Sequence, residues 1–341
     1  MAHTVISSNL PPNIDLTKAP LAYGDRALPK LNKELNDDTL IVRQRALVAL
    51  CDVLHNPEHI SESIRVGIIT SLKKLLKDAD PTVRIKTTEA LHVMAGHAIG
   101  RDAILEHKVV LPLSKLFDDE VYKARRQSHM AILMVTQSPP GPEGVVGVNL
   151  VPILVGKLLT EEDEIKEVIL DTLHFCMKVN TDQALSSNAM EAFTKLLSHT
   201  NANLRSKAAR DIMDLSFPLD GKDAACDAGA VPILSQLLTE QSTLVKASAA
   251  GALMAISITT RGKYAAIEAG TISRLVALLH DESSEVRLNA LKTITELSEA
   301  PPGRTELLKS LKEVEKLVND NQSAAVRKAA RIAVQTITWK P

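Results

Sequence analysis

The stretch Val286-Arg-Leu-Asn-Ala-Leu-Lys-Thr-Ile294 decides the fold of this 341-residue chain, because close copies of it recur along the sequence. Val42-Arg-Gln-Arg-Ala-Leu-Val-Ala-Leu50 and Val326-Arg-Lys-Ala-Ala-Arg-Ile-Ala-Val334 share its spacing. The basic residue at its second position returns at intervals of 39 to 41 residues, as Arg43, Arg84, Arg125, Lys166, Arg205, Lys246, Arg287 and Arg327. Self-similarity at a fixed period of this length indicates a repeat protein, here with eight units.

The residues around each basic position predict two packed helices. Three and seven residues beyond it the chain carries small and aliphatic side chains, as at Ala249 and Leu253. Offsets of three and seven share one face of an α-helix, so each copy predicts a helix with a buried stripe. Eight residues before the basic position stands a large apolar residue, such as Leu238, except in the last unit, where Asn319 occupies that place. This residue predicts a preceding helix, so the repeat is all-α.

A short first helix completes the unit. Gly100, Gly221, Gly262 and Gly303 recur in phase, and an amphipathic stretch follows each of them. This order of helices resembles the armadillo repeat, most strongly over residues 221–298. The resemblance implies an armadillo/HEAT-type, right-handed superhelical solenoid over residues 27–341.

Two stretches depart from the period. Residues 1–26 contain Pro11, Pro12 and Pro20 without a helical pattern, and we expect an extended N-terminal arm there. Pro139-Pro-Gly-Pro-Glu-Gly-Val-Val-Gly147 stands where the fourth unit should have its first helix, and we expect a loop. Its glycine spacing, without a following Gly-Lys-Ser/Thr or a preceding strand, does not fit a phosphate-binding loop.

Acidic residues stand six positions before five of the basic residues. The related HEAT repeat has such a ladder of acid–base pairs, which links neighbouring repeats. A structural role is therefore expected rather than an acidic ligand site, with exposed pairs contributing about 0–1 kcal/mol each. The ladder consists of Asp37 and Arg43, Asp78 and Arg84, Asp119 and Arg125, Glu240 and Lys246, and Asp281 and Arg287.

Composition argues against several classes of partner. Lys+Arg number 40 and Asp+Glu 41, and aromatic residues make up 2%, so neither nucleic acid nor an anionic membrane surface is expected as a partner. The longest mostly apolar run, residues 249–258, is too short to cross a bilayer. Three scattered cysteines without a CxxC pair suggest a reducing compartment, and residues 1–10 lack a secretion signal. We expect a cytoplasmic or cytoskeletal protein.

No catalytic or metal-binding pattern is present in the sequence. His55 and His59 are four residues apart, but Pro57 between them breaks the helical pairing of a metal site. His-Glu-x-x-His, Gly-x-Ser-x-Gly and P-loop motifs are lacking. We therefore expect a non-enzymatic chain without cofactor, metal or small-molecule substrate, whose partners are other proteins.

A partner-binding surface is expected on the third helices, five and nine positions beyond the basic residue. Four of the six residues there in repeats two to four are apolar, although the helical phase points them outward. An alternative is that the helix rotation differs by one position and these side chains belong to the core. The track in those repeats consists of Glu89, Val93, Met130, Met134, Asp171 and Phe175.

A nuclear-import adaptor is one possible function, since importin-α is also built of armadillo repeats. Importin-α reads basic peptides with ladders of Trp and Asn on its third helices, and none of the matching positions here holds either residue. Importin-like peptide binding is therefore disfavoured. A structural scaffold is the preferred function, and a cytosolic adaptor for transport or signalling is the alternative.

At whole-chain level the sequence resembles the armadillo-repeat radial spoke proteins of motile cilia. The resemblance rests on Ala27-Leu-Pro-Lys-Leu-Asn-Lys-Glu-Leu35, on residues 41–58 and on the tail Ile337-Thr-Trp-Lys-Pro341. It implies a structural member of the radial spokes in the axoneme of cilia or sperm flagella, bound to other spoke subunits. No residue role transfers with it, because the match lies in general sequence rather than in a functional motif.

Overall fold

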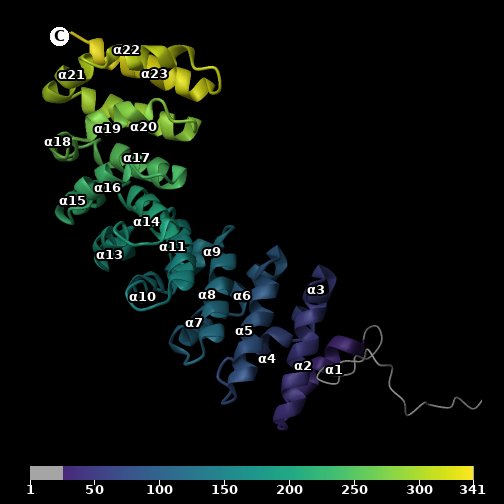
Figure 1. Cartoon of the computed structure of the whole chain (residues 1–341). Helices are drawn as coiled ribbons and strands as arrows, with labels where there is room; N and C mark the ends of the chain where they lie inside the picture. Colours follow the sequence, from purple (N-terminus) through teal and green to yellow (C-terminus); the bar gives the residue numbers. More distant parts are fainter. Residues whose placement is uncertain (1–25, 341) are drawn as a thin grey trace, which may run out of the picture. The chain divides into compact units, whose positions relative to one another are not determined.

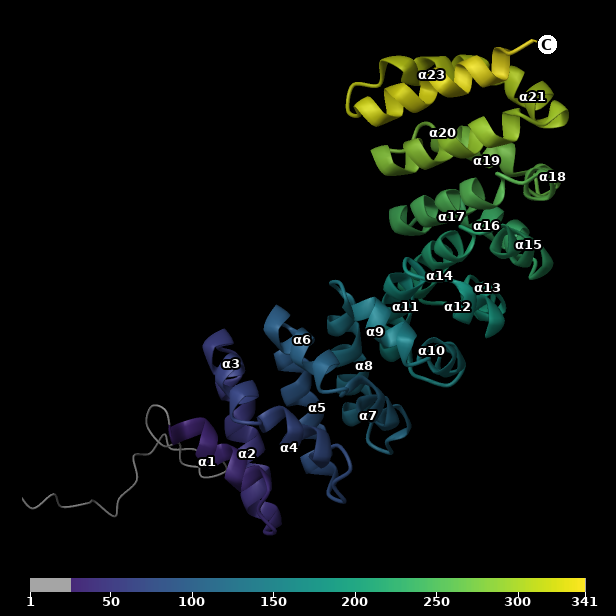
Figure 2. The ribbon, with the colours of Figure 1, turned by 180° about the vertical axis from the view of Figure 1, so that it is seen from behind.

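The structure, a computed structural model, describes residues 26–340, and its regular elements within them are all helices (Figures 1 and 2). The predicted all-α repeat fold is confirmed. The chain divides into two compact units, Met1–Gly144 and Val145–Pro341, and each is described by itself. The expected N-terminal arm lies outside the described residues, except Arg26, which precedes the first helix.

The first unit contains the first three repeats. Its long third helices α2, α5 and α8 pack in sequence order, α2 on α5 and α5 on α8. The elements are α1 (Ala27–Leu35), α2 (Leu40–Val53), α3 (Pro57–Arg65), α4 (Ile68–Leu75), α5 (Pro81–Ala95), α6 (Ala98–Glu106), α7 (Val110–Ser114), the 3-10 helix η2 (Lys115–Asp118) and α8 (Tyr122–Thr136).

The second unit contains five third helices, α11, α14, α17, α20 and α23, each packed on the next. Figures 1 and 2 show the short first helices α15, α18 and α21 along one edge of this stack. The elements are α10 (Val151–Lys157), α11 (Asp163–Met177), α12 (Asp182–Ser186), α13 (Ala189–Leu196), α14 (Ala202–Leu215), α15 (Leu219–Asp227), α16 (Ala230–Leu237), α17 (Thr243–Ile256), α18 (Thr260–Glu268), α19 (Thr271–Leu278), α20 (Ser284–Ser298), α21 (Pro301–Leu308), α22 (Leu311–Lys316), the 3-10 helix η3 (Leu317–Asn319) and α23 (Ala324–Thr338).

The expected loop before the fourth repeat is wrong. A short helix, α9 (Gly141–Gly147), occupies the place of a first helix there. Pro139 and Pro140 precede the helix and Pro142 lies in its first turn, where a missing backbone N–H removes no helical hydrogen bond. The prolines therefore mark the start of a helix rather than its absence.

Close backbone contact explains the glycines that recur in phase. A Cβ built on Gly262 would lie 2.1 Å from the carbonyl oxygen of Ile256, at the end of the preceding third helix. The corresponding distance at Gly100, to the carbonyl oxygen of Met94, is 1.9 Å. Real Cβ atoms do not approach backbone this closely, so only glycine lets the first helix pack against the end of the third helix before it.

The predicted stripe forms the core. Residues three positions beyond the basic residue are fully buried in all eight third helices, and so are those seven beyond it in the first seven. The exception is Val334 of the last described helix, which is half-buried because no other repeat within residues 26–340 packs over it. The buried stripe on each third helix is what joins it to its neighbours.

Candidate protein-binding groove

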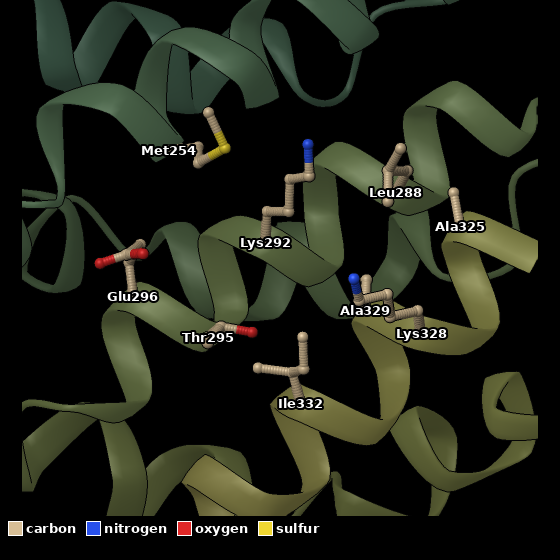
Figure 3. A pocket seen from close by; sticks show the side chains of 9 residues that line it. All are labelled: Met254, Leu288, Lys292, Thr295, Glu296, Ala325, Lys328, Ala329 and Ile332. Atoms are coloured by element: carbon tan, nitrogen blue, oxygen red, sulfur yellow. The ribbon is translucent and has the colours of Figure 1, made fainter. Parts of the chain in front are cut away.

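A groove of about 460 Å³ crosses the third helices of the last three repeats. Met254 of α17, Leu288 of α20 and Ile332 of α23 supply apolar walls, and Ile332 is 44% exposed (Figure 3). Ala325 and Ala329 line the same side of α23, and their small side chains leave room between α20 and α23. The groove therefore presents aliphatic surface to a partner.

Positive charge lies along this groove. Lys292 of α20 and Lys328 of α23 line it and are exposed (Figure 3). Within residues 26–340 neither ammonium has a carboxylate within ion-pair distance, so both are available to a partner. Glu296, in the same wall, has a raised pKa because it is partly buried and Glu299 lies nearby, while the Lys263 charge opposes the shift.

A second groove, of about 500 Å³, opens between α11, α14 and α17. Its walls are formed by Met177, Met213 and Met254, with Phe217 and Ile258 at the ends of the third helices. The Phe217 side chain is 87% exposed and Ile258 is 54% exposed. Flexible methionine side chains beside exposed apolar groups suit an adaptable contact surface.

The four predicted track residues of the first unit are all half-buried. Glu89 of α5 lies 3.1 Å from the Lys86 ammonium and 3.9 Å from that of Lys123. Val93 of α5, and Met130 and Met134 of α8, are partly covered in the same way. These side chains are neither fully outward nor part of the core, so their role as a binding surface stays a prediction.

The two track residues of the second unit take part in side-chain contacts on α11 and α14. Asp171 accepts hydrogen bonds from Lys207 Nζ at 2.6 Å and Arg210 Nη1 at 3.0 Å. Phe175 packs edge-on against the His174 ring, with 5.4 Å between ring centroids. Asp171 is thus engaged within the chain, and Phe175 borders a polar cluster that the sequence analysis missed.

That cluster centres on Asp211, which is fully buried on α14. Arg210 donates to Asp211 Oδ1 from Nε at 3.0 Å and from Nη2 at 2.8 Å. Burial raises the pKa of Asp211 well above its usual range, although the Arg210 charge opposes this. On the adjacent helix, His174 Nδ1 lies 2.5 Å from Asp214 Oδ2. The local sequence gives one signal for this buried carboxylate: Asp211 departs from the apolar pattern that Ile212 and Leu215 follow.

The ladder residues connect each repeat with the next. Arg43 Nε donates to Asp78 Oδ2 at 3.0 Å, and Arg84 Nε to Asp119 Oδ2 at 2.5 Å. Each arginine also donates to the carbonyl oxygen of its own unit's acid, as Arg84 Nη1 does to Asp78 at 3.0 Å. The basic side chain thus holds its own turn and reaches forward by one repeat.

The same arrangement continues in the second unit. Lys246 contacts Asp281, and Arg287 Nε donates to Asp320 Oδ2 at 3.0 Å. One carboxylate oxygen of each acid accepts a backbone N–H two residues on, as Asp281 Oδ1 does from Ser283 at 2.9 Å. The expectation of exposed pairs is wrong here, because packing of consecutive turns covers these side chains.

The remaining ladder residues show parts of the same pattern. Asp37 belongs to the first repeat, and its Oδ1 accepts the Thr39 N–H at 2.8 Å. Arg125 Nη1 donates to the Asp119 carbonyl at 3.0 Å. Glu240 accepts a hydrogen bond from Arg205 Nη2 at 2.8 Å, so a basic residue left out of the predicted ladder belongs to it.

Among residues 26–340, no helix combines the length and the apolar character that crossing a bilayer requires.

Two family profiles match parts of the chain. Residues 23–138 match the family described as non-SMC mitotic condensation complex subunit 1. Residues 220–253 and 259–299 match the armadillo/beta-catenin-like repeat. The second match covers α15–α20, which contribute to both grooves.

Similarity to a curated protein is confined to part of the chain. Radial spoke protein 14 of Chlamydomonas reinhardtii is 25% identical over 108 residues. The aligned part covers 31% of this chain and 28% of that protein.

Among solved structures, an engineered protein from the Northeast Structural Genomics Consortium superposes with a TM-score of 0.66 at 24% identity, covering 92% of this chain and 89% of its own. A second engineered protein from the same consortium has a TM-score of 0.49 at 22% identity, with coverages of 80% and 96%. The first supports the fold. The chain is a helical repeat solenoid that contains armadillo repeats.

Proposed function

We propose that this chain is a structural scaffold that binds other proteins through the groove across α17, α20 and α23. The observation that supports it is the combination of exposed aliphatic side chains with Lys292 and Lys328 in one groove. Stacked repeats create extended surfaces of this kind, on which a partner can contact several units.

The chemistry of the groove favours a particular kind of partner segment. An aliphatic or aromatic side chain would fill the space beside Leu288 and Ile332. Acidic side chains on either side of it would pair with the two lysines, and this charge complementarity adds specificity and speeds association. The partner is therefore proposed to offer an apolar anchor flanked by Asp or Glu.

The axoneme of motile cilia and sperm flagella is the proposed location, with radial spoke subunits as partners. Support comes from the partial similarity to radial spoke protein 14 and from the resemblance carried by residues 27–35, 41–58 and 337–341. A cytosolic adaptor for transport or signalling is the alternative.

Replacement of groove residues in ciliated cells tests both parts of the proposal. The variant combines Leu288→Glu with Ile332→Glu, which places two carboxylates on the apolar walls. We expect the tagged wild-type chain to remain with detergent-extracted axonemes and with isolated spoke complexes, and the variant to be lost from both. Leu244→Glu is the matched control, since Leu244 is 61% exposed and is not part of this groove.

The outcomes separate location from mode of binding. If the wild-type chain stays in the detergent-soluble fraction, the spoke assignment is wrong and the cytosolic adaptor is favoured. If the wild type is axonemal and the variant is retained equally, a surface other than this groove holds the chain.

A further inference from the structure

A histidine and two aspartates converge on the adjacent third helices α11 and α14. His174 lies on α11, while Asp211 and Asp214 lie three residues apart on α14 and so share one face. One potential ligand atom from each of the three residues lies within 4.8 Å of the other two. Imidazole nitrogen with carboxylate oxygen is a donor set that binds divalent transition metals.

Asp211 provides an independent sign that a ligand belongs there. The residue is fully buried, and its Oδ1 is held by Arg210. Its Oδ2 is buried and has no hydrogen-bond partner among the described residues. A buried carboxylate oxygen without a partner is unfavourable, and such atoms are rare in folded proteins. A cation, a proton or a bound water molecule would satisfy it.

The charges around the cluster favour a cation. Arg210 is shared between Asp211 and Asp171, and Lys207 is shared between Asp171 and Glu167. Two cationic side chains therefore serve three carboxylates, and Asp214 adds a fourth. Of the nearby lysines, Lys222 donates to the Phe217 carbonyl and Lys178 packs over the Phe175 ring. A divalent ion would offset the remaining negative charge.

An entry path is also present. Asp214 lines the groove of about 500 Å³ between α11, α14 and α17, together with Met177 and Met213. The side chains of His174 and Asp214 are 18% and 13% exposed, so solvent reaches them. Water in this groove can complete the coordination shell of an ion that has three protein ligands.

We propose that His174, Asp211 and Asp214 form a zinc site. Ligand atoms about 2 Å from zinc lie roughly 3.3 Å apart, so small side-chain movements bring the three groups to bonding distance. Arg210 holds the far oxygen of Asp211 and fixes the carboxylate, as residues behind metal ligands commonly do. Mg²⁺ and Ca²⁺ prefer six or more oxygen ligands and fit this set less well.

Calorimetric titration of the full-length, chelator-treated chain with Zn²⁺ tests the site. We expect one equivalent to bind, and the affinity to fall at least about tenfold in His174→Gln and in Asp211→Asn, each of which removes a ligand. Mg²⁺ and Ca²⁺ should not compete at equal concentration. Co²⁺ gives a second readout, because tetrahedral coordination produces strong visible absorption that the variants should lack.

Two controls exclude binding elsewhere. His199→Gln removes another histidine beside an aspartate, since His199 Nε2 lies 3.4 Å from Asp163 Oδ1 at the surface. Cys226→Ser removes the only half-buried cysteine, the other two being buried within the described chain. Both variants should bind Zn²⁺ as the wild type does.

Stability measurements complete the test. Zn²⁺ should raise the melting temperature of the wild type but not of His174→Gln. The His174 side chain is partly exposed, so its replacement should leave the chain folded. The proposal is overturned if Zn²⁺ fails to bind, or if every variant binds it equally. In the first case a proton or a water molecule satisfies Asp211, and a proton is indicated if Asp211→Asn melts at or above the wild-type temperature without metal.

Discussion

Arg287 of α20 donates from Nε to Asp320 Oδ2 of the next repeat at 3.0 Å, and the two side chains are only 6% and 5% exposed. Its Nη1 also donates to the carbonyl oxygens of Asp281 at 2.7 Å and Glu282 at 3.0 Å. The pair thus connects two inter-helix turns away from solvent. Removing one partner from a buried pair leaves an uncompensated charge, unlike removal at the surface.

Arg287→Ala should therefore lower the free energy of unfolding by about 3–5 kcal/mol. Asp320 would lose its arginine while staying buried. Arg261→Ala is the matched control, because Arg261 also pairs with an aspartate of the neighbouring repeat, Asp227, but the two side chains are 51% and 67% exposed. That replacement should cost much less, because solvent screens an exposed ion pair. Denaturant unfolding compares them, and equal losses would contradict a buried ladder.

Leu253→Ala should cost about 2–5 kcal/mol, through lost apolar burial and the cavity left behind. Leu253 is fully buried on the stripe that α17 presents to its neighbours. Leu244→Ala on the same helix removes the same atoms from a side chain that is 61% exposed, and should change stability by about 0.5 kcal/mol or less. Denaturant midpoints of the two variants measure the difference. A reversed order would show that the helix faces are assigned wrongly.

Gly262→Ala should destabilise the chain by about 1–3 kcal/mol. The added methyl group meets the carbonyl oxygen of Ile256 at 2.1 Å and its carbonyl carbon at 2.7 Å, and backbone cannot move aside as a flexible side chain would. Gly156→Ala in α10 is the control, since no heavy atom lies within 4 Å of its new Cβ. There alanine should raise stability by up to about 1 kcal/mol through its better helix propensity. Thermal melts that fall equally for both would rule out the close contact.

The spacing of the repeats predicted the positions of the third helices well and the contacts between them less well. Ala249 and Leu253 repeat in register, so one amphipathic pattern seen eight times predicts the buried stripe. The partner of Arg287 was missed because Asp320 stands seven residues before Arg327 rather than six. Exposure of the ladder depends on how consecutive turns pack, and no local pattern carries that information.

The candidate sites illustrate the same limit. Lys292, Ile332 and Glu296 occupy the positions five and nine beyond the basic residue, so the groove across α17, α20 and α23 uses the predicted track in later repeats. Which repeats leave room depends on the sizes of facing side chains, such as Ala325 and Ala329. His174 meets Asp214, 40 residues away, because neighbouring repeats stack side by side. Sequence motifs for metal sites are recognised within a single segment, so they could not predict this pairing.

Acid should weaken the ladder. Burial raises the pKa of Asp281, but the Lys246 ammonium and the Ser283 amide outweigh it and hold the pKa below its usual value of 3.8. Asp281 therefore binds a proton more readily in the unfolded chain than in the folded one. The stabilisation of the fold by the ionised carboxylate is complete above about pH 3.8 and is lost as the pH falls through the folded pKa. Urea midpoints measured from about pH 6 to about pH 2.5 should fall at the acid end. Asp281→Asn should show a shallower fall, and an identical slope would exclude this group.

Removal of the last repeat should act locally. Deletion from Leu307 onward takes away the last two residues of α21 together with α22, η3 and α23, and uncovers the face of α20 that α23 covers. Because each repeat contacts mainly its neighbours, the lost stabilisation falls first on the unit next to the cut. Amide hydrogen exchange in α20 should speed up by about tenfold or more, with a smaller effect in α17 and none in α2. Peptide-level exchange measured by mass spectrometry follows all three helices in one experiment.

The internal control is α5, which lies in the first unit and should keep its protection. A uniform loss of protection from α2 to α20 would mean that the chain unfolds as a single cooperative block, contrary to the near-neighbour stability of a solenoid.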